Sequence, residues 1–151
     1  RNWARLPAAV RRRLVVENDD RNYPVGDCLE LHTRCGIPVL FDTFHHAILS
    51  RGEPMAAALA AVARTWSAAD GPPMVDYSSQ APGARPGTHV HSLDAADFQT
   101  FLRDSRPHDF DLMLEIKDKE RSALRALALA AGDPRLQPAA ATRAMPGGGR
   151  P

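Results

Sequence analysis

The sequence predicts an α/β protein built on a parallel sheet, and two features of the chain predict it. Short apolar runs, each too short for a helix, alternate with longer stretches of helical periodicity. Four such pairs follow one another along the chain, and successive βα units place parallel strands side by side with their helices outside. The 151 residues are enough for one domain with a core, and 44% hydrophobic and 25% charged residues are ordinary globular values.

Four runs rich in Val, Leu, Ile, Phe and Met are the expected strands, and a helix candidate follows each of them. The expected strands are 13–17, 37–42, 73–79 and 110–115, and the expected helices are 24–35, 53–67, 94–104 and 117–131. A further helix over residues 2–12 leads into the first strand. We expect Gly36 and Gly71 to stop the first two crossover helices, and Ser92 to cap the third with Asp94 in its first turn.

The composition of the chain changes near Gly132. The residues beyond, 132–151, are rich in Pro, Gly and Ala and offer few apolar side chains to bury. We expect this segment to be a disordered tail, which leaves residues 1–131 as the folded domain.

Charge and cysteine content narrow the class of protein only a little. The formal net charge of +1 gives no bulk reason to expect nucleic-acid binding, although nearly all basic residues are Arg, whose planar fork suits phosphate. Cys28 and Cys35 fall in one expected helix, where a disulfide or a metal site would be awkward. With no run long enough for a membrane span and no signal-peptide pattern, we expect a cytoplasmic protein. Because the chain opens with Arg, we also expect that an N-terminal part is missing.

Every expected strand ends in or near a carboxylate. The acids are Glu17, Asp42, Asp76 and Glu115, and in βα folds the carboxyl ends of the strands carry the chemistry. Four neighbouring carboxylates would repel one another and raise each other's pKa, and a shared divalent cation removes that penalty. A single acid at such a position more often caps the next helix or lies in solvent. Four in succession favour a metal site.

Histidines occur beside these acids. His45 and His46 follow Asp42 closely, and His89 and His91 lie in the loop after the third expected strand. A mixed set of imidazole and carboxylate ligands fits Mn, Zn or Fe better than Ca.

Four blocks of sequence occur in a fixed order. They read "RLVVENDD", "GIPVLFDTFHH", "YSSQ.PGARPGTH" and "DFDLMLEIKDKE". In this order and at these intervals they resemble the C-terminal half of the UV damage endonuclease family, over roughly residues 10–130. The resemblance implies a TIM-barrel type of fold, of which this chain supplies about four of the eight βα units. We therefore expect an incomplete barrel whose N-terminal half is missing.

The resemblance also implies an activity and a metal. Family members nick the DNA backbone 5′ of UV photoproducts with a cluster of up to three divalent metals, usually manganese. Glu17 and Glu115 would be the catalytic carboxylates that bridge or hold the metals. Where better-known members read Lys, any residue, His, this chain has Met74 and Asp76; Asp76 can still coordinate through oxygen, whereas Met74 cannot replace a carboxylated lysine. The implied metal ligands are Glu17, Asp42, His45, Asp76, His89 and Glu115.

The implied partner is damaged double-stranded DNA, bound by a complete enzyme that acts as a monomer. Arg21 and Arg85 are the candidate phosphate contacts. Two other interpretations stay open at this point. One is a metal-dependent sugar isomerase or epimerase on the same type of barrel, and the other is a half-barrel without catalytic activity.

Overall fold

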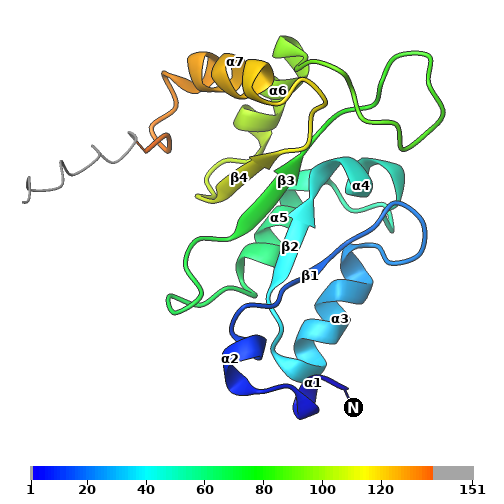
Figure 1. Cartoon of the computed structure of the whole chain (residues 1–151), viewed down its shortest axis with the longest axis vertical. Coiled ribbons are helices and arrows are strands. Elements are labelled where there is room, and N and C mark those ends of the chain that lie inside the picture. The colour runs from blue at the N-terminus through cyan, green and yellow to red at the C-terminus, as the bar shows by residue number, and fades with distance from the viewer. Residues whose placement is uncertain (1, 138–151) are drawn as a thin grey trace, which may run out of the picture.

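The computed structural model describes residues 2–137 and shows four strands in one sheet, in the order β1-β2-β3-β4 (Figure 1). All neighbouring strands are parallel. The predicted α/β fold is therefore confirmed, although each strand is shorter than its apolar run. The strands are β1 (Val16–Glu17), β2 (Val39–Asp42), β3 (Met74–Tyr77) and β4 (Asp111–Leu114).

Four helices connect or follow the strands within the predicted ranges. At Gly36 the backbone takes the left-handed conformation with φ 72°, and its N–H donates to the carbonyl of His32, which ends the first of these helices as predicted. No helix in the described part of the chain has both the length and the apolarity that a membrane crossing requires. The helices are α3 (Val25–Cys35), α5 (Met55–Ala63), α6 (Ala95–Asp104) and α7 (Glu120–Ala130).

The single helix predicted over residues 2–12 is wrong. The chain forms two short helices instead, α1 (Asn2–Arg5) and α2 (Ala8–Arg11). Pro7 stands between them with ψ 145°. Proline lacks the N–H that a helix bond needs and disfavours helical backbone in the residue before it, so the helix cannot continue through this position.

Two predicted helix boundaries are also wrong. The helix α5 ends well before Gly71, because the residues that follow it bond to β2 instead. The hydroxyl of Thr65 accepts from the backbone N–H of Val39 at 3.0 Å. The cap of α6 is Asp94 rather than Ser92, since the Asp94 carboxylate accepts from a backbone N–H in the first turn at 2.9 Å.

A short helix that the sequence pattern does not predict, α4 (Thr43–Ile48), follows β2 directly. Asp42 caps it, because its Oδ1 accepts from the backbone N–H of His45 at 2.8 Å. The hydroxyl of Thr43 donates to the carbonyl of Asp76 at 3.0 Å, which fastens α4 to the end of β3. Figure 1 shows α4 and the loops that follow β1 and β3 gathered at the same end of the sheet.

The apolar core lies between one face of the sheet and the helices. Val39, Phe41 and Val75 are 0% exposed and pack in one cluster with Leu59 of α5 and Phe98 of α6. Because side chains alternate between the two faces of a strand, the residues between these positions point to the opposite face.

The chain beyond α7 is held against α6. Arg135 donates hydrogen bonds to the carbonyls of Leu102 at 2.6 Å and His108 at 3.0 Å, and it pairs with Asp133 at 2.7 Å. The start of the predicted tail, up to residue 137, therefore contacts the domain. Residues 138–151 of that tail lie outside the described residues.

Truncating the core is expected to destabilise the chain strongly. Leu59→Ala should lower the free energy of unfolding by about 3 kcal/mol, because the side chain is 0% exposed and its loss leaves a cavity. Urea unfolding followed by circular dichroism measures the change. The matched control is Leu124→Ala on α7, where the side chain is 69% exposed and the expected cost is below about 0.5 kcal/mol. Equal losses in the two variants would contradict the core described above.

Candidate metal centre

Strand register brings four acids onto one face of the sheet. Glu17 pairs with Leu40 on β2, and Asp42, two residues further along β2, pairs with Asp76 on β3. Asp76 pairs in turn with the β4 residue that lies two positions before Glu115. Lateral partners share a face, and so do residues two apart on one strand. All four acids therefore lie on the face opposite the core.

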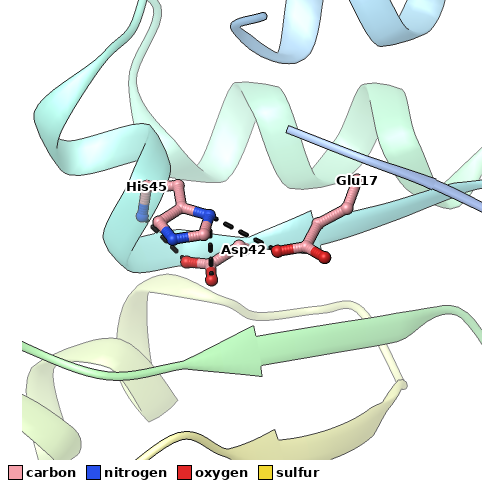
Figure 2. A group of neighbouring side chains, drawn as sticks. All are labelled: Glu17, Asp42 and His45. Atoms are coloured by element: carbon pink, nitrogen blue, oxygen red, sulfur yellow. Dashed lines mark hydrogen bonds and ion pairs between the residues drawn. The ribbon is translucent and has the colours of Figure 1, made fainter. Parts of the chain in front are cut away.

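Three of the predicted ligands form a tight group. In Glu17, Asp42 and His45, one candidate ligand atom of each lies within 4.8 Å of the others. Figure 2 shows the His45 ring above the two carboxylates, with its Nδ1 3.4 Å from Glu17 Oε1 and 3.2 Å from Asp42 Oδ2. The group joins the end of β1, the end of β2 and the first turn of α4.

The two oxygens of Asp42 have different surroundings. Oδ1 accepts the N–H that caps α4, whereas Oδ2 faces the His45 ring. A strand-end acid was expected either to cap a helix or to bind a cation, and Asp42 has one oxygen for each purpose.

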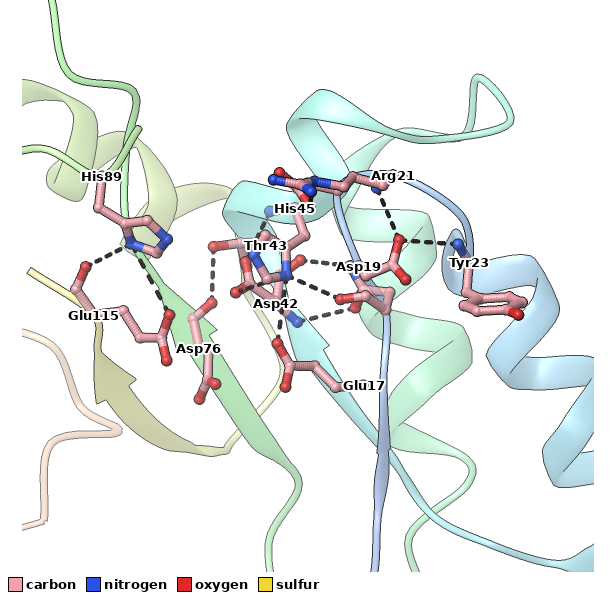
Figure 3. Close-up of polar contacts among 12 residues, drawn as sticks. Glu17, Asp19, Arg21, Tyr23, Asp42, Thr43, His45, Asp76, His89 and Glu115 are labelled. Carbon is pink, nitrogen blue, oxygen red and sulfur yellow. Dashed lines mark hydrogen bonds and ion pairs between the residues drawn. The ribbon is translucent and has the colours of Figure 1, made fainter. Parts of the chain in front are cut away.

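A second pair lies across the sheet from this group. His89 Nδ1 is 2.9 Å from the backbone carbonyl of Glu115 and 3.9 Å from its carboxylate. The rings of His89 and His45 lie 6.3 Å apart, centroid to centroid. Figure 3 shows Asp76 between the two groups, as the position of β3 between β2 and β4 requires.

Both of these histidines use the same ring nitrogen, Nδ1, to contact a backbone carbonyl. The Nδ1 of His45 lies 3.0 Å from the carbonyl of Asn18, and that of His89 bonds to the carbonyl of Glu115. A carbonyl oxygen only accepts, so Nδ1 carries the hydrogen in each ring. In the neutral ring Nε2 then keeps its lone pair, which is the arrangement that metal-binding histidines adopt.

Burial and mutual repulsion raise the pKa of three of these carboxyls. For Glu17 and Asp42, burial is the main cause of the raised pKa. For Asp76, burial acts first and the charges of Glu115, Glu17 and Asp42 add to it, which raises its pKa to about 7. Burial disfavours the charged form of His45, but the neighbouring acids, Asp42 foremost, outweigh it and raise its pKa.

The four acids have little positive charge around them. Their ion-pair partners in the described part of the chain are His45 and His89, and no Lys or Arg there pairs with them. A divalent cation would offset both causes of the raised pKa values, the burial of these carboxylates and their mutual repulsion. Carboxylate oxygens together with free Nε2 atoms form a donor set that suits Mn, Fe or Zn. The residues present therefore fit the metal that the sequence predicts.

Two histidines near the acids in sequence lie outside the cluster. His46 is 5% exposed, and its Nε2 lies 3.1 Å from the carbonyl of Glu53. His91 is exposed and lies 3.1 Å from the hydroxyl of Ser92. Neither takes part in the group formed by Glu17 and its neighbours.

The loop after β1 is organised by Asp19. One carboxylate oxygen accepts from the backbone N–H of Arg21 at 2.8 Å, Asn22 at 2.5 Å and Tyr23 at 3.0 Å (Figure 3). These bonds hold the pKa of Asp19 below its ordinary value. Of the three neighbouring acids in "ENDD", Glu17 thus enters the site while Asp19 shapes a turn that exposes Arg21.

The loop after β3 is organised by Gln80, whose role the sequence pattern did not indicate. Its amide nitrogen donates to the carbonyls of Ala81 at 3.1 Å and Arg85 at 3.0 Å, and its amide oxygen accepts from Gly87 N–H at 3.0 Å. Gln80 also forms an isolated antiparallel bridge with His89. The Gln80 side chain thus braces the loop, on which Arg85 is exposed, while the Gln80 backbone pairs with that of His89.

The two loops touch at Gly87. A Cβ there would lie 2.7 Å from the Asp20 carboxylate, and the backbone has φ 82°, so this position requires glycine. We call the two loops together, residues 18–24 and 79–91, the rim. Arg21 and Arg85, the predicted phosphate contacts, are both exposed on it.

Comparison with known proteins identifies the relationship. A family model described as UV-endonuclease UvdE matches residues 1–138. The chain belongs to the UvdE family. The resemblance read from the four sequence blocks is thus confirmed.

Relatives of the UvdE family cover most of this chain. The chain is 30% identical over 129 residues to the UV DNA damage endonuclease of Clostridium perfringens strain 13, and 32% identical over 126 residues to that of Bacillus cereus strain Q1. These matches cover 84% and 82% of this chain but only 31% and 40% of those relatives. The crystal structure of SacUVDE is similar with a TM-score of 0.80 and 45% identity, over 86% of this chain and 43% of that one.

The raised pKa of Asp76 predicts how stability of the metal-free chain depends on pH. Between the ordinary value of 3.8 and about 7, the folded chain holds a proton on Asp76 that the unfolded chain has released. The free energy of unfolding therefore falls as pH rises through this window, by at most about 4 kcal/mol. Asp76→Asn cannot ionise and should flatten the slope, as measured by unfolding in the presence of EDTA.

A matched control for this slope is Asp118→Asn. Hydrogen bonds from Ser122 and Ser92 lower the pKa of Asp118, so that carboxylate stabilises the fold above its ordinary pKa and the contribution is lost as pH falls. The control variant should change the profile in the opposite sense. A wild-type slope that Asp76→Asn leaves intact would show that Asp76 does not titrate in this window.

Proposed function

We propose that the chain is the C-terminal, metal-binding half of a DNA repair endonuclease that nicks the phosphodiester backbone 5′ of UV photoproducts. The observation that carries the proposal is the group of Glu17, Asp42 and His45, which Asp76 and Glu115 extend along the same face of the sheet. This group lies in a chain of the UvdE family, whose relatives are UV DNA damage endonucleases.

The proposed architecture is half of an eight-stranded TIM barrel. Two observations support it: the match to SacUVDE covers 43% of that chain, and β1 and β4 are the edge strands of the described sheet. Met113 on β4 is 55% exposed, a surface that further βα units would cover. The proposed partners are an N-terminal half-barrel and damaged double-stranded DNA. The complete enzyme is proposed to be a monomer in the cytoplasm, where two free cysteines are compatible with a reducing environment.

Manganese is the proposed metal, with up to three ions in the complete barrel. A divalent ion held there supplies Lewis-acid stabilisation of the phosphate charge and lowers the pKa of bound water. The residues proposed to hold it are Glu17, Asp42, His45, Asp76, His89 and Glu115.

The residues of the site would have different roles in binding the metal and in catalysis. Glu17 and Glu115 are the proposed catalytic carboxylates, and they stand on either side of Asp76. Asp42 offers Oδ2, because its Oδ1 is engaged in the cap of α4. Asp76 and Met74 stand where the family resemblance expects His and Lys. Since the pKa of Asp76 is about 7, cation binding would release a proton there, and metal affinity should rise with pH.

The rim is the proposed contact with DNA. Arg21 and Arg85 are exposed on its two loops, beside the acidic cluster, where they would bind phosphates on either side of the scissile bond. A photoproduct weakens base stacking, so DNA bends or flips its bases there at a lower cost than in an intact duplex.

The other interpretations can be weighed against the same observations. A sugar isomerase or epimerase finds no support in the comparisons, which give UV endonucleases. A half-barrel without activity is an outcome that the nuclease test below decides for this chain alone.

The test is nicking of a duplex that carries a single UV photoproduct, with Mn²⁺ present. The chain alone is compared with the chain joined to the N-terminal half of a UvdE relative. We expect the joined protein to cut 5′ of the lesion and the chain alone to cut poorly or not at all. A joined, folded protein that leaves irradiated DNA intact but turns over a small sugar would overturn the proposal.

Glu17→Gln is expected to abolish stabilisation by the metal. Mn²⁺ at about 100 times its dissociation constant should stabilise the wild-type chain by about 2.7 kcal/mol, whereas the variant lacks the carboxylate shared by the site and should gain little. Thermal unfolding with and without Mn²⁺ measures this. The control is Glu120→Gln, an exposed acid in the first turn of α7, which should keep the full effect. Loss of the effect in both variants would argue against a specific site.

Arg85→Ala is expected to weaken DNA binding by a similar factor for all sequences. Removing one phosphate contact should reduce the slope of log affinity against log salt by about 1. Fluorescence anisotropy at several salt concentrations measures the slope. Arg64→Ala serves as the control, because Arg64 precedes the Thr65 that bonds to the start of β2, at the end of the sheet opposite the rim. An unchanged slope in Arg85→Ala would remove this residue from the proposed interface.

A further inference from the structure

Asn18 is a polar side chain with no exposure to solvent. It is 0% exposed and stands between Glu17 in the metal group and Asp19 in the rim. A buried amide is costly unless its donors and acceptor are satisfied. Here the amide nitrogen donates to the carbonyl of Asp42 at 2.8 Å, and the amide oxygen accepts from the N–H of Asp42 at 3.0 Å.

These two bonds stand in for the next pair of backbone hydrogen bonds between β1 and β2. The ladder between β1 and β2 has its last pair at Glu17 and Leu40. Beyond it the N–H and the carbonyl of Asp42 face β1 with no ladder partner on that strand. The Asn18 side chain imitates a strand by supplying one acceptor and one donor at that point. The end of β1 is thereby locked to the residue that caps α4.

The main chain of Asn18 reaches the same site by a second route. Its carbonyl lies 3.0 Å from Nδ1 of His45, and the two nearest carboxylates, those of Asp42 and Glu17, lie 3.2 and 3.4 Å from the same nitrogen. The three oxygen atoms that lie near Nδ1 in the described part of the chain can all accept a hydrogen bond from it. One residue therefore contacts the backbone of one candidate ligand and the ring of another.

We propose that Asn18 is a positioning residue of the candidate metal centre, which clamps the main chain of Asp42 and holds His45 with its hydrogen on Nδ1, so that in the neutral ring Nε2 keeps the lone pair that a metal ligand needs. The inference deepens the proposed function and rests on it for the identity of the bound ion. It also makes a prediction that does not depend on the ion: the neutral His45 ring should carry its hydrogen on Nδ1 before any metal binds.

The first measurement needs no variant and no metal. Long-range ¹H–¹⁵N spectra of the ¹⁵N-labelled 151-residue chain in EDTA, above the pKa of His45, distinguish the two neutral tautomers, and His45→Gln assigns the signals. We expect the Nδ1–H form. A ring that shows the Nε2–H form, or the mixture found in free imidazole, would overturn the proposal.

The second measurement compares two buried clamps on the same strand. Asn18→Leu removes the side-chain bonds to Asp42, and Thr65→Val removes the hydroxyl that accepts from Val39 at the opposite end of β2. Both variants lose a buried bond to the main chain, so both should lower the melting temperature. Asn18→Leu keeps the backbone carbonyl at position 18 but frees it from Asp42, so only this variant should loosen the contact with Nδ1, mix the His45 tautomers and raise the dissociation constant for Mn²⁺, by about 10- to 100-fold.

The outcomes separate the positioning role from general stability and from the proposed function. If Thr65→Val weakens Mn²⁺ binding as much as Asn18→Leu does, Asn18 contributes only to stability and the proposal is overturned. If wild type holds the Nδ1–H form but binds no Mn²⁺, the proposed function fails while the positioning of His45 by Asn18 stands. If Asn18→Leu does not fold, an Nε2–H ring in the wild-type chain would still overturn the proposal.

Discussion

Parallel strand register is the constraint on which the rest of the structure depends. Val39, Phe41 and Val75 can fill the core only if their immediate neighbours along each strand face the other way. Asp42 and Asp76 are such residues, paired across the two central strands. A slip of one residue would bring these carboxylates into the apolar cluster, at a cost that no hydrogen bond there would offset. Burial of the core therefore holds the acids together against their own repulsion, and the pKa values of Asp42 and Asp76 are raised first by burial and then by the neighbouring charges.

In several residues of the site, one side-chain atom fixes the local structure while another is available to a ligand. One oxygen of Asp42 fixes the start of α4 while the other faces the cluster. In His45 and His89 one ring nitrogen bonds to a carbonyl, which leaves the second nitrogen with its lone pair. Such arrangements reduce the freedom of the ligands before binding, so less conformational entropy is lost when a cation enters.

Much of this could be predicted from the sequence, and what could not has a common physical cause. The four βα units and the strand-end acids follow from local apolar runs, whose meaning does not depend on distant residues. The helix break at Pro7 could also be predicted from the sequence, because proline disfavours a continuous helix; the predicted helix over 2–12 was wrong for this reason. The role of Asn18 could not be predicted from the sequence, because it depends on hydrogen bonds to Asp42, 24 positions away. Gln80 likewise acts on a loop whose path its own bonds create.

The contact between Gly87 and Asp20 couples the two loops of the rim mechanically. Each loop is also braced internally, one by the three N–H bonds of Asp19 and the other by the amide of Gln80. Neither loop can shift far without displacing its neighbour. Under the proposed function, a duplex that approaches this braced surface would have to bend or unstack more than the protein does. DNA softened by a lesion would therefore bind at a lower energetic cost than stiff, intact DNA.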